Sequence, residues 1–261
     1  MKKNLTITLL ACSSILLSVC GQASADEVNL YSARKEVLMQ PLLDAFTSET
    51  GIKVNIISSK ADALLTRIKR EGINSPADVL LTTDAGRLHR AKSAGIFSML
   101  SSEVLNTNVP AHYRDSDNQW VGLSVRARPI MVTDSATKFD IKSYQDLTNK
   151  ELEKQICVRS SGNIYNQSLV AASIHGAGEA ETEAWAKGLV ANFARKPQGG
   201  DRDQIRAAAA GQCSVVIANT YYLANMLGDQ DKADDFQAAS KVSVIWPCLL
   251  YTSDAADIYS V

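Results

Sequence analysis

Residues 27–58 read EVNLYSARKEVLMQPLLDAFTSETGIKVNIIS, and this stretch decides the fold class. The apolar run at 28–31 predicts a strand, and apolar residues at helical spacing over 36–50 predict a helix that Gly51 ends. The alternating residues at 53–57 predict a second strand. A strand, a helix and another strand in this order are typical of parallel strands joined by a crossover helix.

The same alternation continues downstream of this unit. An amphipathic helix is expected at 61–71, a strand at 77–82 and a further helix at 84–94. Three strand–helix units in succession predict an α/β lobe that has a parallel sheet with helices on both of its faces.

The pattern of alternating strands and helices stops after this lobe. We interpret the polar stretch 101–118 as a loop and 120–132 as an extended crossover. Strands and helices alternate again beyond it, so we expect a second α/β lobe and a hinge at the crossover. Strands are expected at 155–159, 214–219 and 241–246, and helices at 143–147, 165–175, 179–192, 204–210 and 221–227.

Both ends of the chain differ from the two lobes. A positive start at Met1-Lys2-Lys3, an apolar run and the small residues Ala23-Ser24-Ala25 are typical of a secretory signal peptide. Cys20 leaves lipidation open as an alternative. We therefore expect residues 1–25 to be a signal peptide, 26–126 the first lobe, 127–245 the second lobe, and 246–261 the start of a return strand followed by a tail foreign to the fold.

Composition and motifs exclude several classes of function. The hydrophobic content of 46% is typical of a globular protein, and the formal net charge of −1 gives no strong field for nucleic acid or anionic membrane. The sequence has no Gly-x-Ser-x-Gly elbow, phosphate-binding glycine loop, Cys-x-x-Cys or His-Glu-x-x-His motif, and its three histidines are scattered. We therefore predict that the protein is not an enzyme.

Two cysteines lie in the main body of the chain. Cys157 and Cys213 each precede a segment that carries candidate site residues. In an oxidising compartment such cysteines pair readily. Two buried free thiols are the alternative, and the sequence leaves both open.

Three tyrosines follow short apolar strands of the expected second lobe. Tyr221 and Tyr222 come after the apolar run 215–218 and a turn that begins at Asn219. Tyr165 follows another strand and a turn of small residues. Positions just beyond the carboxyl ends of strands are where α/β folds bind ligands. Amphipathic tyrosines at a surface rim are the alternative.

Groups that bind anions accompany these tyrosines. Ser161, Gly162 and Asn163 offer hydroxyl, backbone N–H and amide donors at an expected helix N-terminus. Arg34 follows the first strand, and Arg126 lies on the crossover. Closure of two lobes would bring phenols and guanidinium groups together over one ligand. A capped helix and surface ion pairs are the alternatives.

Four segments, in order and at suitable spacing, carry a resemblance to a known family. They are Leu30-Tyr-Ser-Ala-Arg-Lys, Arg126-Ala-Arg-Pro, Arg159-Ser-Ser-Gly-Asn-Ile-Tyr-Asn-Gln-Ser-Leu and Ala218-Asn-Thr-Tyr-Tyr. From residue 27 to 247 the chain thereby resembles the periplasmic ferric-iron-binding proteins that serve ABC importers. The resemblance implies the type II periplasmic binding fold, in which crossing strands join two α/β lobes that hold Fe(III) between them.

The resemblance also implies the composition of the site. Tyr165, Tyr221 and Tyr222 match the phenolate ligands of that family. A synergistic anion, carbonate or bicarbonate, would complete the iron's ligand shell. The expected partners of that anion are Ser161, Gly162, Asn163, Asn219, Arg34 and Arg126.

The chain departs from the family pattern at two places. Some members place a His-Tyr pair or a glutamate ligand in the first lobe, whereas Lys35-Glu36 stands here. This departure indicates the subgroup with three tyrosines and leaves ligation by Glu36 open. Family members also continue well past Pro247, so we interpret the chain as C-terminally truncated.

The resemblance further implies a monomeric solute-binding protein of the periplasm, which delivers iron to an inner-membrane ABC permease and its ATPase. The first alternative is a periplasmic binder of a small anion without metal, using Arg34, Arg126 and the turn 160–163. A hydrolase with a tyrosine or serine nucleophile ranks last, because no base lies near any candidate nucleophile.

Overall fold

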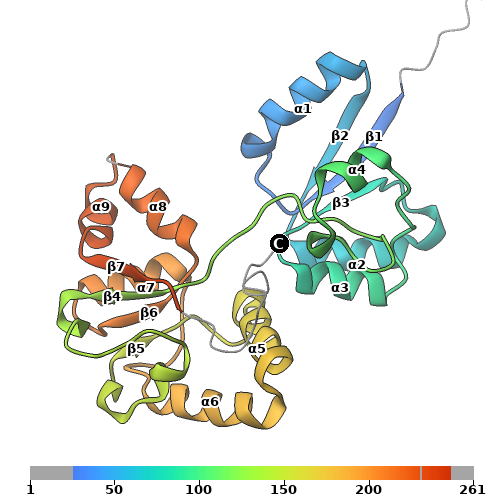
Figure 1. Cartoon of the computed structure of the whole chain (residues 1–261). Coiled ribbons are helices and arrows are strands. Elements are labelled where there is room, and N and C mark those ends of the chain that lie inside the picture. The colour runs from blue at the N-terminus through green and yellow to red at the C-terminus, as the bar shows by residue number, and fades with distance from the viewer. Residues whose placement is uncertain (1–25, 230, 248–261) are drawn as a thin grey trace, which may run out of the picture.

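The computed structural model describes residues 26–229 and 231–247, which form two lobes joined by an extended segment (Figure 1). The signal peptide expected at 1–25, the lipidation alternative at Cys20 and the foreign tail expected at 248–261 lie outside the described residues. Within the described ranges, no helix combines the length and the hydropathy that spanning a bilayer requires.

The first lobe is built around a small parallel sheet. Its elements are β1 (Glu27–Ser32), α1 (Glu36–Thr50), β2 (Lys53–Ser58), α2 (Ala61–Glu71), β3 (Val79–Leu81), α3 (Ala85–Ser93) and α4 (Glu103–Asn108). The strands lie in the order β2-β1-β3 and all run parallel. The parallel sheet predicted from the strand–helix alternation is therefore confirmed.

Two features of this lobe differ from the sequence expectation. Residues 101–118 are not all loop, because they contain the helix α4. Ser102 caps its start, where the side-chain oxygen accepts a hydrogen bond from the backbone N–H of Leu105 at 3.3 Å. Helix α1 has the predicted bounds, but none of its residues is buried. Its apolar side chains lie at the surface, with Val37 74% and Leu42 62% exposed.

The second lobe is built around a mixed sheet. Its elements are β4 (Ile130–Thr133), β5 (Ile156–Cys157), α5 (Ile164–Ala177), α6 (Glu179–Ala191), α7 (Asp201–Ala209), β6 (Val215–Ile217), α8 (Thr220–Gly228), α9 (Ala233–Ala239) and β7 (Val242–Ile245). The strands lie in the order β5-β6-β4-β7. Strands β5 and β6 run parallel, whereas β4 is antiparallel to both β6 and β7.

Short 3₁₀ helices complete the described elements. The helix expected at 143–147 is one of them, because the chain there makes a single tight turn rather than an α-helix. Their bounds are Gly72–Asn74, Ala111–Tyr113, Asp134–Ala136, Gln145–Thr148 and Lys150–Leu152.

Alternating side chains of the second sheet reach two separate cores. Ile130, Val215 and Ile217 pack with residues of α5 and α6 on one face. Met131 and Val216 pack with residues of α7, α8 and α9 on the other. Full burial of a side chain of this size stabilises the fold by about 1.5–3 kcal/mol. These cores hold β5 and β6 in place, and the candidate site lies at the ends of these strands.

The crossover between the lobes enters the second sheet through β4. Strand β7 lies antiparallel to β4, with Ile245 opposite Ile130. The carboxyl end of β7 therefore lies beside the point where the chain arrives from the first lobe.

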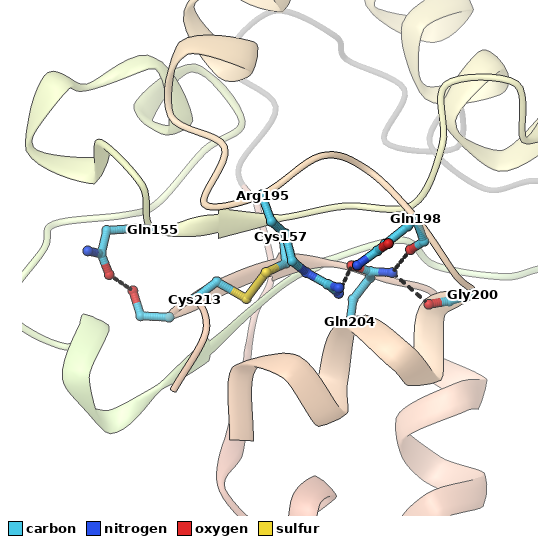
Figure 2. The surroundings of a disulfide bond; sticks show 8 residues. Gln155, Cys157, Arg195, Gln198, Gly200, Gln204 and Cys213 are labelled. Atoms are coloured by element: carbon cyan, nitrogen blue, oxygen red, sulfur yellow. Dashed lines mark hydrogen bonds between the residues drawn. A yellow bond between two sulfur atoms is a disulfide. The ribbon is translucent and has the colours of Figure 1, made fainter. Parts of the chain in front are cut away.

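A disulfide between Cys157 and Cys213 ties β5 to the segment that leads into β6 (Figure 2). Of the two alternatives that the sequence left open, the structure has the pair. Beside it, the Ser214 hydroxyl donates a hydrogen bond to the Gln155 side chain at 2.7 Å. The bridge closes a long loop, and such a cross-link typically contributes about 2–4 kcal/mol of stability.

Candidate metal and anion site

The topology of the second lobe brings two of the tyrosines to one sheet edge. Tyr165 is the second residue of α5, and Tyr221 is the second residue of α8. These helices follow β5 and β6, which are parallel neighbours, so their first turns lie side by side. Asn219 is the N-cap residue of α8 and places both Tyr221 and Tyr222 in its first turn.

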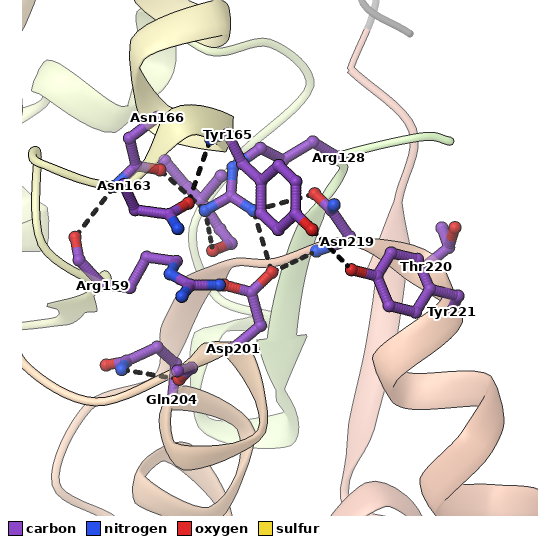
Figure 3. Close-up of polar contacts among 12 residues, drawn as sticks. Arg128, Arg159, Asn163, Tyr165, Asn166, Asp201, Gln204, Asn219, Thr220 and Tyr221 are labelled. Carbon is purple, nitrogen blue, oxygen red and sulfur yellow. Dashed lines mark hydrogen bonds and ion pairs between the residues drawn. The ribbon is translucent and has the colours of Figure 1, made fainter. Parts of the chain in front are cut away.

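The three tyrosines predicted from the sequence lie together. The Tyr221 hydroxyl donates a hydrogen bond to the Tyr165 hydroxyl at 3.2 Å (Figure 3). The Tyr222 ring lies against that of Tyr221, with 4.2 Å between the ring centroids and 34° between the planes. All three side chains are half-buried. A phenol at each of these positions can therefore face a shared ligand.

Two arginines flank the Tyr165 ring. The guanidinium carbon of Arg128 lies 5.9 Å from the ring centroid, and that of Arg159 lies 5.5 Å from it. Two guanidinium groups are thus within cation–π range of this ring.

The other two tyrosines each have one guanidinium beside them. Arg126 lies 5.6 Å from the ring centroid of Tyr221, and Arg202 lies 5.6 Å from that of Tyr222. The site thus combines three phenols with a positive surround, which suits anionic oxygen ligands and a bound anion.

The Tyr221 phenol keeps its proton at neutral pH. Burial raises the pKa of Tyr221 well above its ordinary value, and its contacts with the hydroxyls of Tyr165 and Tyr222 add to the rise. A cation that binds this oxygen must therefore displace a proton from it.

A buried network of ion pairs and hydrogen bonds connects the segments that carry the tyrosines. Arg128 donates to Asp201 at 2.9 Å, to the Asn219 side chain at 2.8 Å and to the Asn166 side chain at 2.7 Å. Asp201 is fully buried, and it also accepts from Arg159 at 3.3 Å and from the backbone N–H of Asn219 at 2.9 Å. The Asp201 carboxylate thereby joins the crossover, the segment between β5 and α5, and the turn before α8 (Figure 3). Arg128 links α5 to this network through Asn166.

Sequence reasoning missed the role of Asp201. The helix expected at 204–210 begins three residues earlier, at Asp201, as α7. The two arginine partners of Asp201 lie 42 and 73 residues away. Such distant pairing has no local signal, so only the fold reveals it.

The predicted anion-binding residues divide into two groups. Arg126 and Asn219 lie with the tyrosines, as described above. Ser161 and Gly162 are exposed in the turn before α5. The side-chain oxygen of Asn163 caps α5 by accepting from the Tyr165 backbone N–H at 3.0 Å, which is the structural alternative considered for this turn.

The first-lobe candidates do not join the tyrosines in the described residues. The described hydrogen bonds of Arg34 involve only its backbone, with the Ser32 hydroxyl. Glu36 is exposed in the first turn of α1. Neither side chain lines the cleft that contains Tyr165.

Several buried donors near the tyrosines have no hydrogen-bond partner within the described part of the chain. They belong to guanidinium groups and to one carboxamide. Unsatisfied buried donors are rare in folded proteins, and positively charged ones favour an anion nearby. They are Nη1 of Arg126, Nε of Arg128, Nε of Arg159 and Nδ2 of Asn219.

A cleft of about 400 Å³ lies between the lobes at this site. Asp84 and Trp120 line it from the first lobe, and Tyr165, Ser168 and Asn219 line it from the second. No three His, Cys, Asp or Glu side chains of the described ranges are grouped so that they could hold a metal ion.

The sequence profile of the bacterial extracellular solute-binding proteins matches residues 74–248. The chain is 46% identical over 245 residues to "Iron uptake protein A1" of Synechocystis, an alignment that covers 90% of this chain and 68% of that protein. It is 32% identical over 220 residues to the "Fe(3+)-binding periplasmic protein" of Serratia marcescens, covering 83% and 64% of the two chains. The chain thus spans about two thirds of the length of these relatives.

A solved structure has a similar overall fold. It is that of a Trichodesmium protein in complex with iron and citrate ligands, with a TM-score of 0.81 and 47% sequence identity. The similarity covers 85% of this chain and 70% of the Trichodesmium chain.

Proposed function

The chain belongs to the bacterial extracellular solute-binding proteins, and from this premise we propose that it captures ferric iron between its lobes and hands it to an ABC importer. In this proposal Tyr165, Tyr221 and Tyr222 bind the metal through their phenolate oxygens. The family and the two-lobe type II fold predicted from the four sequence segments are confirmed by the relatives and the solved neighbours. The role is that of a binding protein and not of an enzyme.

The observation that carries the proposal is the distance between two phenol oxygens. The hydroxyls of Tyr165 and Tyr221 are 3.2 Å apart. Neighbouring oxygen ligands of a small octahedral cation, bound at about 2.0–2.1 Å, lie roughly 2.9 Å apart. Replacing the shared proton by a metal ion therefore needs only a small movement of either side chain.

The charge of the ligands suits a ferric ion. Fe³⁺ is a hard cation, and charged oxygen donors suit it better than thiolates do. Binding lowers the pKa of a coordinated group, so that the phenols ionise at neutral pH. Three phenolates then balance the 3+ charge, and little uncompensated charge remains in the half-buried site.

A bound anion completes the shell in this proposal, with carbonate or bicarbonate as the candidate. The unpartnered donors of Arg126 and Asn219 are the groups that support it. The first turn of α5 adds backbone N–H groups and a positive dipole end. The iron- and citrate-bound Trichodesmium neighbour makes a carboxylate anion a second candidate for the same place.

The family also indicates the transport partners and the compartment in this proposal. Solute-binding proteins serve transporters, so the partners in this proposal are an inner-membrane ABC permease and its ATPase. The Serratia relative is named as periplasmic, which supports the same compartment for this chain. Export by a signal peptide and a monomeric state are further parts of the proposal. Metal-free binding of a small anion is not favoured, because the two relatives described above, which match most of this chain, are named for iron.

Ferric titration of the purified chain tests the proposal. Addition of Fe³⁺ with bicarbonate should give a visible phenolate-to-iron charge-transfer band, and Tyr165→Phe, Tyr221→Phe and Tyr222→Phe should each lower affinity at least tenfold. Tyr113→Phe, a half-buried tyrosine of the first lobe, is the control and should bind as the native chain does. A colourless titration of the native chain would refute the proposal.

A further inference from the structure

One side-chain hydrogen bond crosses directly between the lobes near the tyrosines. The Ser168 hydroxyl donates to Oδ1 of Asp84 at 2.5 Å. Asp84 is the residue before α3 in the first lobe, and Ser168 lies in α5, three residues after Tyr165. Helices α3 and α5 pack against each other (Figure 1). The bond therefore joins the helix that carries one tyrosine to the opposite lobe.

Asp84 has an unusual backbone conformation and an unusual side-chain environment. Its φ of 80° is positive, a conformation that favours glycine over a residue with a β-carbon. The side chain is fully buried, and its Oδ2 has no hydrogen-bond partner among the described residues. Strained backbone and unsatisfied buried groups tend to gather at functional sites.

Capping alone does not account for this residue. Oδ1 of Asp84 accepts from the backbone N–H of Gly86 at 2.9 Å, as an N-cap residue does. Glycine tolerates the N-cap position almost as well and fits the positive φ without strain. What a glycine could not supply is the bond to Ser168.

The contact between the helices is close. A β-carbon placed on Gly86 would lie 3.1 Å from Cδ1 of Ile164 and 3.4 Å from the Ser168 hydroxyl. The first turn of α3 therefore packs closely against the start of α5, and a side chain added at Gly86 would make tight contacts there. Asp84 and Ser168 also line the cleft that contains Tyr165, so opening the lobes there would separate them.

We infer that the Asp84–Ser168 hydrogen bond is an interlobe latch that stabilises the closed form and slows the release of bound iron. The inference rests on the proposed function, because it assumes that iron lies at Tyr165 and that release requires the lobes to part. Parting the lobes breaks this hydrogen bond, so the bond adds to the stability of the form in which α3 and α5 are in contact. Ser168 and Asp84 are positioning residues here, since neither is assigned a bond to the metal.

Iron release after rapid mixing with a strong chelator tests the latch, with decay of the charge-transfer band as the signal. Ser168→Ala should release iron roughly tenfold faster, since a hydrogen bond to a charged group is lost, while the association rate stays unchanged. Asp84→Gly should have the same effect, because glycine fits the backbone and the variant should fold. The double variant should release iron no faster than either single one. Ser173→Ala is the matched control, since that hydroxyl bonds only within α5, to the Leu169 carbonyl at 2.9 Å.

Small-angle X-ray scattering of the iron-loaded proteins gives a second measurement. The two latch variants should show a larger radius of gyration than the native chain and the Ser173→Ala control. Native release rates and radii in both latch variants, with the charge-transfer band intact, would overturn the latch and leave the iron site standing. Absence of the band in the native chain would instead overturn both inferences.

Discussion

At the scale of single residues, the proton on Tyr221 links metal binding to pH. Burial raises the pKa of this phenol, and its hydroxyl donates a hydrogen bond to the Tyr165 hydroxyl. The neutral phenol suits the metal-free protein, because a buried phenolate without a cation would be costly. The same proton must leave when a metal binds, so protons and iron compete for one oxygen.

We expect ferric affinity to fall as the pH is lowered. Below the raised pKa the phenol is protonated, and each phenolate formed on binding releases a proton, so acid opposes binding. Titration in weakly buffered solution should detect this release, and Tyr221→Phe should release about one proton fewer per iron bound. Equal proton release by the native chain and the variant would contradict this role for Tyr221.

Asp201 is the second residue on which the site depends. It is fully buried and pairs with Arg128, which is 5% exposed. Removing one partner of a buried pair leaves the other charge uncompensated. We expect Asp201→Asn to lower the free energy of unfolding by about 3–5 kcal/mol, measured by urea denaturation followed by circular dichroism.

The control for Asp201 is an exposed aspartate that pairs with a lysine. Asp140 and Lys142 are 80% and 73% exposed, and Asp140→Asn should change the free energy of unfolding by less than about 1 kcal/mol. Similar small changes in both variants would show that the Asp201 network does not stabilise the second lobe.

At the scale of elements, the strands β5 and β6 and the helices that follow them determine where the tyrosines lie. The sequence predicts this part well, because the apolar run at 215–217 and the turn at Asn219 are strong local signals. The same periodicity predicts α1 and α2 with the bounds that the structure has. Convergence of Tyr165 and Tyr221 then follows from the parallel pairing of two neighbouring strands.

Elements with weak local signals were not predictable in the same way. Helix α4 is short and polar, and only Ser102 at its start marks it. Helix α9 was not expected, because it is only seven residues long and Phe236 is its one large apolar side chain. The interlobe contact of Asp84 and the pairing of Asp201 are long-range, and neither has a counterpart in sequence periodicity.

The disulfide should stabilise both the lobe and the metal site. Cys157 and Cys213 hold together the strands whose ends carry Tyr165 and Tyr221. The double substitution Cys157→Ala, Cys213→Ala should lower the free energy of unfolding by about 2–4 kcal/mol in urea denaturation. Ferric affinity should fall with it, because the phenols lose part of their fixed spacing. An unchanged ferric affinity in the folded variant would show that the two cores alone position the tyrosines.

At the scale of the whole molecule, the two lobes differ in how completely their helices bury apolar side chains. The second lobe has a core on each face of its sheet, whereas α1 of the first lobe has no buried residue. Strand β7 ends beside the start of β4, near the crossover from the first lobe. The Synechocystis relative is longer than this chain, which covers 68% of it.

We therefore expect additional chain after residue 247 to stabilise the first lobe. A chimera that joins residues 1–247 to the corresponding remainder of the Synechocystis relative should have a higher melting temperature, because it would bury the apolar side of α1. Hydrogen exchange should show slower exchange of the α1 amides in the chimera than in the original chain. A flexible glycine–serine extension of equal length is the control, and equal α1 exchange in both would contradict the expectation.

The central claim is that three tyrosine oxygens bind one ferric ion between the lobes. X-ray diffraction from crystals of the iron-loaded protein, recorded on both sides of the iron absorption edge, locates the metal directly. We predict a single anomalous peak within bonding distance of the phenol oxygens of Tyr165, Tyr221 and Tyr222. A peak elsewhere, or bonding distance to fewer than two of these oxygens, would contradict the claim.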